Sequence, residues 1–247
     1  MVETQVLLGE PVTVVEEYKD WSRICAPWQP SRKDSRGYPG WIPSRDLASV
    51  CPPEPQFAVV TARRAELVEQ QGSACALFAP WATILPVREI LGTTVRVMLP
   101  GGTQATLNRD ACVIRDSAYL SSFDIKAEEL LVTAMTMLGI PHVLGGMTEA
   151  ALDCSGLVHL ACRVLGVQLP REAHDIAGAG NAVPIENAAE GDFYVFREPE
   201  KPIHHIGIVV SPPGTVLHTP GGGVTTIEQL DSDRLRTLMD VVTRLCS

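Results

Sequence analysis

The sequence predicts an α+β domain in the second half of the chain, preceded by two small β-barrels. Short runs of β-branched and aromatic residues, separated by turn residues, fill the first half of the 247 residues. Apolar residues at helical spacing first appear after residue 120. Strand-like runs return from residue 193 onward, and helices followed by antiparallel strands are typical of α+β folds.

Residues 1–50 are expected to form the first barrel. Pro39-Gly40 predicts a turn, after which a strand begins at Trp41. We expect Trp21 and Trp41 in the core of this barrel. Pro52-Pro53-Glu54-Pro55 interrupts the chain and predicts a boundary near residue 51. The expected strands are 4–8, 11–17 and 21–25.

Residues 51–119 are expected to form the second barrel, with less regular turn signals. Pro100-Gly101-Gly102 predicts the hairpin turn between its last two strands. The expected strands are 57–61, 74–78, 83–87, 93–99 and 104–107.

Residues 120–247 are expected to form the α+β domain. Asp124 is a suitable N-cap for a helix that ends near Leu138. A second helix is expected to begin after Asp153 and to end at Gly166. The expected strands are 193–196, 205–210, 216–218 and 224–227, with 239–245 closing the sheet.

Charge and hydropathy exclude several classes of partner. The net charge is −9, and an acidic surface repels phosphate backbones, so no nucleic acid is expected. No apolar run approaches the roughly 18 residues of a transmembrane helix, so no membrane partner is expected. The N-terminal sequence lacks the basic and apolar regions of a signal peptide, although a leader already removed would leave the same sequence.

The seven cysteines are scattered, odd in number and without a CxxC pair. A zinc ribbon or a thioredoxin-type pair is therefore not indicated, and cysteines without partners suit a reducing compartment. We expect a cytoplasmic protein, or a periplasmic or secreted one if a leader has been removed. The histidines are scattered too, so neither a metal nor a cofactor is expected.

The sharpest local feature is the run Leu152-Asp153-Cys154-Ser155-Gly156-Leu157, where a Gly-rich loop meets the second expected helix. A cysteine at a helix N-terminus lies at the positive end of the helix dipole, near backbone N–H groups that favour the reactive thiolate. The same N–H groups are suitable donors to an oxyanion. Cys154 is therefore a candidate nucleophile, and the alternative is a buried, inert cysteine.

Two histidines begin the strand expected at 205–210, and they point to opposite faces because side chains alternate along a strand. His205 shares its face with Gly207, which leaves room beside the ring, and is the candidate general base. His218 in the next strand is the candidate for the polar group that orients the base. A shift of register by one residue would exchange His205 with His204.

Asp153 is unexpected beside a nucleophile, because a carboxylate raises the pKa of a neighbouring thiol. A positively charged partner, such as a substrate ammonium group, would explain its presence. The alternative is that Asp153 caps the second helix, a position that Asp favours. The nearby His159 is expected to be exposed or hydrogen-bonded, His174 to lie in a loop, and Arg171 to hydrogen-bond a loop.

These motifs resemble the NlpC/p60 family of bacterial cell-wall cysteine peptidases. The similar segments are Gly139–Gly146, Asp153–Val158, Leu169–Arg171, Gly191-Asp192 and His205–Ile208, within about residues 120–247. The combination of DCSGL with a later HxGI strand is specific, although each part alone is weak. The family commonly has a tyrosine where this chain has His142.

The resemblance implies a papain-like fold for the α+β domain. It implies that Cys154 is the nucleophile, His205 the general base and His218 the orienting residue of a thiol hydrolase. It also implies cleavage next to γ-D-glutamate in the stem peptides of peptidoglycan, so a peptidoglycan-derived peptide is the expected partner.

The first half resembles bacterial SH3-like domains at Gly9–Val12 and Tyr38–Ile42, so both barrels are expected to be SH3-like. Two such barrels before the peptidase are similar to the γ-D-glutamyl-L-diamino acid endopeptidases of this family, which remove L-Ala-γ-D-Glu from the N-terminus of a stem peptide. In that group, side chains flanking the nucleophile and in the first barrel bind the free α-amine. The matching residues here are Asp153, Ser155, Tyr38 and Glu3, with Glu10 as a rival for Glu3.

Three functional hypotheses follow from these motifs. The first is a peptidase that recycles muropeptides inside the cell. The second is a cell-wall binding protein with an inactive papain-like domain, against which the intact set of Cys154, His205 and His218 argues. The third keeps the nucleophile for acyl transfer or lipid amide cleavage, and such relatives are expected to carry an apolar tail or a membrane segment.

Overall fold

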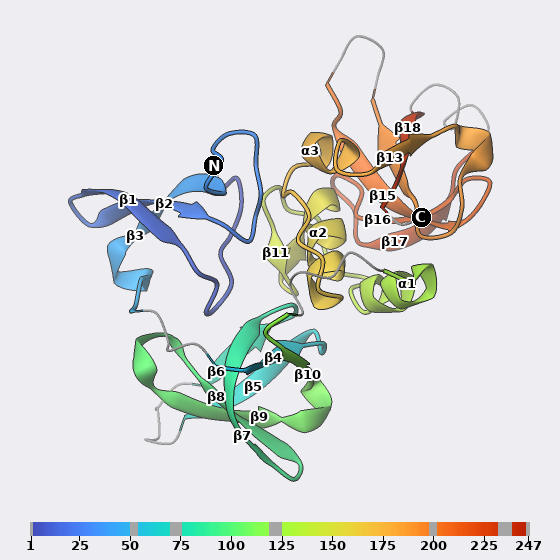
Figure 1. Ribbon diagram of the computed structural model, residues 1–247. Helices are drawn as coiled ribbons and strands as arrows, with labels where there is room; N and C mark the ends of the chain where they lie inside the picture. Colours follow the sequence, from blue (N-terminus) through green and yellow to red (C-terminus); the bar gives the residue numbers. More distant parts are fainter. Residues whose placement is uncertain are drawn as a thin grey trace. The chain divides into compact units, whose positions relative to one another are not determined.

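The computed structural model describes residues 2–49, 54–69, 76–118, 125–197, 202–231 and 239–245 (Figure 1). The chain divides into two compact units. The first unit is Val6–Leu120, and the second unit combines Ser121–Ser247 with the first five residues. None of the helices in these described ranges is long and apolar enough to cross a membrane.

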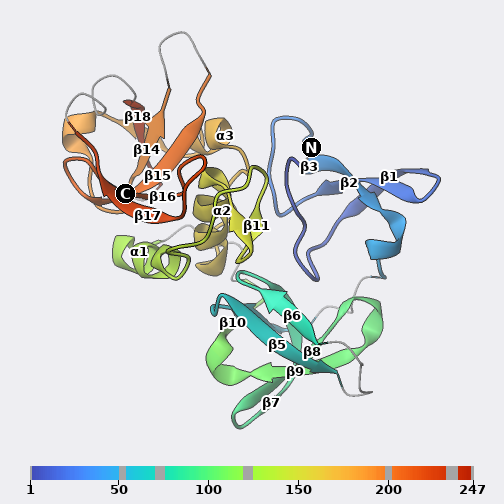
Figure 2. The same ribbon diagram turned by 180° about the vertical axis from the view of Figure 1, so that it is seen from behind.

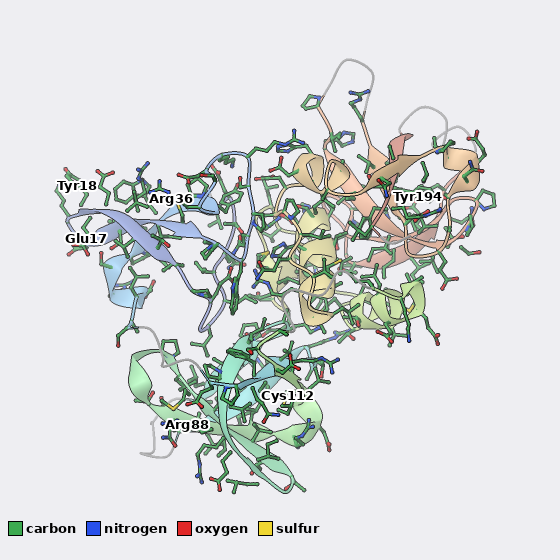
Figure 3. All side chains as sticks on the ribbon, in the orientation of Figure 1. Glu17, Tyr18, Arg36, Arg88, Cys112 and Tyr194 are labelled. Atoms are coloured by element: carbon green, nitrogen blue, oxygen red, sulfur yellow. The ribbon has the colours of Figure 1, made fainter. Side chains whose placement is uncertain are left out.

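The first unit holds two antiparallel sheets. The smaller sheet has the order β1 (Thr13–Tyr18), β2 (Trp21–Ala26) and β3 (Tyr38–Pro43). The larger sheet has the order β10-β4-β7-β8-β9-β5-β6 and a buried apolar core that includes Cys112, labelled in Figure 3. Its strands are β4 (Gln56–Val60), β5 (Arg64–Glu69), β6 (Leu77–Pro80), β7 (Ile84–Leu91), β8 (Thr94–Met98), β9 (Gln104–Asn108) and β10 (Cys112–Asp116).

Most strands expected in the first unit are confirmed, and the turn at Pro100–Gly102 joins β8 to β9. The strand expected at 4–8 is wrong, while β5 and β10 were missed. The first two residues of the strand expected at 74–78 lie outside the described residues, and β6 begins at Leu77. Each sheet order ends in two edge strands, so a closed barrel is not found among the described residues. The two SH3-like barrels therefore stay a prediction.

Two expectations for the smaller sheet are wrong. Pro39-Gly40 is not a turn, because β3 runs through it and pairs with β2; a proline is tolerated there since β3 is an edge strand. Trp21 and Trp41 are 48% and 49% exposed and do not lie in the core. The twofold alternation of a strand explains this, because Ser22 and Ile24 occupy the buried face of β2 and Trp21 takes the other.

The second unit is an α+β domain with one six-stranded antiparallel sheet (Figures 1 and 2). The sheet order is β13-β18-β14-β15-β16-β17. The helices are α1 (Ala127–Met135), α2 (Cys154–Val164) and α3 (Ala173–Ala177), and β11 (Met147–Thr148) pairs with β12 (Ala151–Leu152). The sheet strands are β13 (Asn181–Val183), β14 (Phe193–Phe196), β15 (His205–Ser211), β16 (Thr215–His218), β17 (Thr226–Gln229) and β18 (Met239–Arg244).

The two predicted helices and the C-terminal strands are confirmed. Helix α1 begins after Lys126 rather than at Asp124, which lies outside the described residues. The strand expected at 239–245 is β18, and it lies between β13 and β14 rather than closing the sheet at its edge. Helix α3 contains His174, so this residue is not in a loop.

Helix α2 is the central element of the second unit, and all of its residues are buried. It packs against α1 and against β15, and both views show it beside the orange strands of the sheet (Figures 1 and 2). The helix therefore has no solvent face, and its buried polar residues Ser155, His159 and Arg163 are hydrogen-bonded within the fold. The start of α2 is therefore fixed against the strand that carries His205.

Tyr194 of β14 secures the turn between β15 and β16. Its side chain lies within the second unit in Figure 3, and its hydroxyl accepts a hydrogen bond of 3.0 Å from the Gly214 backbone N–H. Because Gly214 belongs to this turn, the bond helps to hold the register of the two strands that carry His205 and His218.

Candidate active site

Cys154 is the first residue of α2 and is 9% exposed. Asp153 is the helix N-cap, and its side chain accepts a 2.7 Å hydrogen bond from the Gly156 N–H, so the capping alternative is confirmed. The thiol lies within hydrogen-bonding reach of the backbone N–H groups of Ser155 and Ile206. The nucleophile candidate therefore touches β15 at the residue that follows His205.

Burial, followed by the Asp153 carboxylate, raises the pKa of the Cys154 thiol to about 11. The backbone N–H groups of Ile206 and Ser155 lower this pKa, as expected at a helix N-terminus, but burial outweighs them. The resting side chain is therefore a neutral thiol near pH 7. Nucleophilic attack requires a base that removes its proton.

The base candidate His205 is held from two sides. Its Nε2 atom lies 2.8 Å from Nδ1 of His218, and its ring packs on Phe196 with centroids 5.2 Å apart. Phe196 is its direct cross-strand partner on β14. His218 is 3% exposed and continues the series of side-chain hydrogen bonds to Glu228, whose Oε2 lies 3.0 Å from His218 Nε2. The structure thus brings the two predicted histidines together.

Gly207 makes this arrangement sterically possible. A Cβ atom on Gly207 would lie 2.5 Å from Val216 Cγ2 and 2.9 Å from His218 Cβ. The room predicted beside Gly207 is therefore filled by β16, and it allows the His218 side chain to approach β15. This identifies the reason for a glycine at the third position of the HxGI pattern.

The Asp153 carboxylate is surrounded by protein donors and is 4% exposed. Beyond the capping bond, it accepts bonds of 2.7 Å from the Gly145 N–H and 2.7 Å from Arg171 Nη2, and one of 3.3 Å from the Ser155 hydroxyl. A positively charged partner was expected to explain the presence of Asp153, and the structure supplies it as the guanidinium of Arg171. The free-energy cost of burying this carboxylate is therefore compensated within the fold by an ion-pair partner and three further hydrogen-bond donors.

Arg171 is 1% exposed and binds three other residues. Besides Asp153, it donates 2.8 Å to the Ser155 hydroxyl and, through Nε, 3.0 Å to the Thr4 hydroxyl. We expected Arg171 to hydrogen-bond only a loop, but it also binds Asp153 and Ser155 at the start of α2. The Leu169–Arg171 motif marked the position, but sequence spacing did not reveal that the side chain reaches the start of α2.

Residues 2–5 belong to the second unit and pack along its Gly-rich loop. The Gln5 side chain accepts a 2.9 Å hydrogen bond from the Met147 N–H. A Cβ atom on Gly145 would lie 2.6 Å from the Val2 carbonyl oxygen and 2.9 Å from the Glu3 carbonyl carbon. Glu3 therefore lies beside the loop whose Gly145 N–H binds Asp153.

The rival carboxylate Glu10 lies in the first unit. It is 9% exposed and accepts hydrogen bonds of 3.1 Å from the Leu7 N–H and 2.9 Å from Gln29 Nε2. These bonds hold the Glu10 carboxylate against residues of its own unit. Tyr38, also in the first unit, is 1% exposed, and its hydroxyl accepts a 2.5 Å bond from Lys33 Nζ.

His159 is buried within α2 and is not part of the nucleophilic array. Its Nδ1 lies 2.8 Å from the Leu169 carbonyl oxygen and its Nε2 lies 2.9 Å from Arg163 Nη2. Because the guanidinium only donates, the ring must be neutral with its proton on Nδ1. The expectation of a hydrogen-bonded histidine is confirmed, and burial lowers its pKa well below the usual value.

No group of three His, Cys, Asp or Glu side chains in the described ranges is arranged to hold a metal ion. Cys25, Cys112, Cys154 and Cys162 form no disulfide with one another. The site combines a thiol at the start of helix α2 with a pair of hydrogen-bonded histidines on the antiparallel sheet against which this helix packs. These features define a papain-like thiol hydrolase.

A family model described as NlpC/P60 matches residues 139–244. The chain is similar to gamma-D-glutamyl-L-lysine dipeptidyl-peptidases of two bacilli. The protein of Bacillus subtilis (strain 168) is 32% identical over 225 residues, covering 90% of this chain and 74% of that protein. The protein of Bacillus cereus (strain ATCC 10987 / NRS 248) is 30% identical, covering 89% and 67%.

A crystal structure of an NlpC/P60 family protein from Bacillus cereus ATCC 10987 has the same fold. Its TM-score is 0.91 at 26% identity, with 99% of this chain and 82% of that chain covered. The chain belongs to the NlpC/P60 family, and it is a cysteine peptidase. The family resemblance stated from the motifs is confirmed.

Proposed function

We propose that this peptidase hydrolyses the amide between γ-D-glutamate and a diamino acid in peptidoglycan stem peptides that carry a free N-terminal L-Ala. The observation that carries the proposal is the contact of the Cys154 thiol with the β15 backbone beside the hydrogen-bonded pair His205 and His218. The names of the two Bacillus relatives supply the substrate class.

In the proposed mechanism, His205 removes the thiol proton of Cys154 as the sulfur attacks the γ-carbonyl carbon. Backbone N–H groups at the start of α2 stabilise the oxyanion that forms. The protonated His205 then gives its proton to the leaving amine of the diamino acid, and a thioester remains on Cys154. Water, deprotonated by His205, hydrolyses the thioester and restores the thiol.

Recognition of the free amine is proposed for Asp153, Ser155, Glu3 and Tyr38, as the family resemblance implies. Glu3 is supported by its place beside Gly145. Ser155 is supported by its hydroxyl, which bridges Asp153 and Arg171 at the residue after the nucleophile. Asp153 would act through its negative charge within this cluster, because its oxygen atoms are already bonded to the protein.

The domain boundaries at 50/51 and 119/120, the SH3-like character of the first half, a recycling role and a cytoplasmic location belong to the same proposal. They are supported by turn signals, by the motif near Tyr38 and by scattered cysteines. Each stays a prediction.

One observation favours wall binding as a second function of the first unit. Tyr18, Trp21 and Trp41 are 60%, 48% and 49% exposed on the smaller sheet. In the strand register Trp21 is opposite Tyr18 and Trp41 is opposite Arg23, so the three aromatic side chains share one face. Exposed aromatic faces of this kind are common in binding surfaces.

The test incubates the protein with L-Ala-γ-D-Glu-diaminopimelate, its lysine analogue and the N-acetylated form of each, followed by mass spectrometry of the released dipeptide. Cleavage of the amine-bearing peptides and not the acetylated ones is expected. Cys154→Ala is the control and should abolish cleavage without loss of fold. Equal cleavage of the acetylated peptides would refute amine recognition, and no cleavage of any of them would refute the substrate class.

A further inference from the structure

Glu228 of β17 extends the side-chain hydrogen bonds that start at the proposed base. His205 Nε2 lies 2.8 Å from His218 Nδ1, and His218 Nε2 lies 3.0 Å from Glu228 Oε2. The two imidazole rings meet edge to face with centroids 5.0 Å apart. Neither the motifs nor the family resemblance assigns a role to Glu228.

The strand register accounts for the position of Glu228. On β16 and β17, Val216 pairs with Glu228 and His218 pairs with Thr226. Residues two apart on a strand share a face, so Glu228 is the diagonal neighbour of His218. The side chain of His218 is 3% exposed and that of Glu228 is 36% exposed. The carboxylate therefore reaches a buried ring from the edge strand of the sheet.

A carboxylate can only accept hydrogen bonds, so His218 must donate from Nε2. Neutral His218 then has its lone pair on Nδ1, which accepts the Nε2–H of His205. Neutral His205 is left with its lone pair on Nδ1. We propose that Glu228 is a positioning residue that fixes both tautomers and leaves Nδ1 of His205 as the proton acceptor for Cys154. This inference rests on the proposed roles of Cys154 and His205.

The charge of Glu228 has a second effect. When His205 takes the thiol proton, the positive charge on the histidine pair faces the Cys154 thiolate from one side and the Glu228 carboxylate from another. Phe196 on β14, which packs on the His205 ring, is apolar. Removal of the carboxylate should therefore allow other tautomers of His205 and His218. It should also make protonation of the histidine pair less favourable.

Two substitutions separate these effects. Glu228→Ala removes the acceptor and the charge. Glu228→Gln removes the charge and replaces an obligate acceptor with an amide that can also donate, so it permits either His218 tautomer. The matched control is Glu129→Gln on α1, which loses the same charge from a side chain that is 57% exposed.

The first readout is the rate at which iodoacetamide alkylates Cys154, followed by mass spectrometry of its peptide from pH 6 to pH 10. We expect alkylation near pH 7 to fall about tenfold in Glu228→Ala, since hydrogen bonds to charged groups have about this effect on an equilibrium. The difference should narrow as the pH rises toward 10, because hydroxide then deprotonates a growing fraction of the thiol without the histidine. Glu228→Gln should be intermediate, and Glu129→Gln should match the unsubstituted protein.

The second readout is the long-range ¹H–¹⁵N NMR spectrum of the imidazole rings, in which His218 should carry its proton on Nε2. A wild-type His218 protonated on Nδ1, or a Glu228→Ala alkylation profile equal to that of the wild type, would overturn the inference. A rate reduced by the same factor at every pH would also overturn it, because that pattern reports altered access to Cys154. Neither readout needs a substrate, so failure of peptide cleavage would refute only the proposed function.

Discussion

Arg171→Met removes a buried cation that joins three parts of the second unit. The guanidinium binds Asp153 at 2.7 Å, Ser155 at 2.8 Å and Thr4 at 3.0 Å, and the side chains of Arg171 and Asp153 are 1% and 5% exposed. Methionine fills a similar volume but leaves the Asp153 carboxylate without a counter-charge. Loss of one partner from a buried ion pair costs about 3–5 kcal/mol.

The expected loss of unfolding free energy lies at the lower end of that range, at about 3 kcal/mol. Asp153 keeps the N–H donors of Gly145 and Gly156, each at 2.7 Å, and these continue to satisfy its oxygen atoms. Arg171→Lys retains a charge but has no planar group to reach Asp153, Ser155 and Thr4 together, so a loss of about 1–2 kcal/mol is expected.

Urea unfolding, followed by a probe specific to the second unit, measures both substitutions. The exposed Arg197→Met is the matched control and should lie within about 0.5 kcal/mol of the unsubstituted protein. Arg171 also lowers the pKa of the Cys154 thiol, so Arg171→Met should slow alkylation of Cys154 at neutral pH. Arg171→Met with unchanged stability would refute the view that this pair is a compensated buried ion pair.

Two further predictions concern the interior of the second unit. Gly207→Ala should lower stability by about 1–3 kcal/mol in urea unfolding and reduce peptide cleavage, because the added Cβ would lie 2.5 Å from Val216 and 2.9 Å from the Cβ of His218; normal cleavage would contradict the close packing of β15 on β16. The pKa of His159 is lowered by burial from 6.5, so the folded state binds fewer protons than the unfolded state. Stability should therefore fall as the pH drops below about 6.5, and His159→Gln should flatten this slope in unfolding curves between pH 5 and pH 7. An unchanged slope in His159→Gln would show that other groups carry the pH dependence.

The proposed catalytic residues Cys154 and His205 could be located from the sequence because each has a local signature. A cysteine at a helix start and a histidine at a strand start are both visible in the one-dimensional pattern, and Gly207 follows His205 at the spacing of a shared face. Glu228 has no such signature, and the Leu169–Arg171 motif marked Arg171 without indicating what its side chain contacts. Their roles depend on contacts with residues 18 positions and 10 positions away, which only the folded backbone brings together.

The first half shows a different limit of sequence reasoning. Runs of β-branched and aromatic residues between turn signals predicted most of the strands, but they could not decide which face of the smaller sheet is buried. Trp21 and Trp41 were expected in the core, while the structure gives the buried face of β2 to Ser22 and Ile24. Buried residues are mostly hydrophobic, but a hydrophobic residue need not be buried, since folded proteins also expose large apolar side chains.

Gly145 links the N-terminal segment to the nucleophile, and this link yields a last prediction. Its φ of +79° favours glycine, its N–H binds Asp153 at 2.7 Å, and the missing Cβ leaves space for the backbone of Val2 and Glu3. Gly145→Ala would strain the backbone and press on the Val2 carbonyl oxygen. We therefore expect Glu3 to be displaced while Asp153 still caps helix α2 by accepting the Gly156 N–H.

The expected result of Gly145→Ala is a higher KM for peptides with a free amine, with a smaller effect on kcat. The matched substitution Gly222→Ala has a similar φ of +74° but meets no atom within 4 Å, so it carries the backbone strain without the contact. Steady-state kinetics on L-Ala-γ-D-Glu-diaminopimelate distinguish the two. If both substitutions change KM equally, strain alone is responsible; if only Gly145→Ala does, residues 2–5 are part of the substrate site, and their removal should raise KM in the same way.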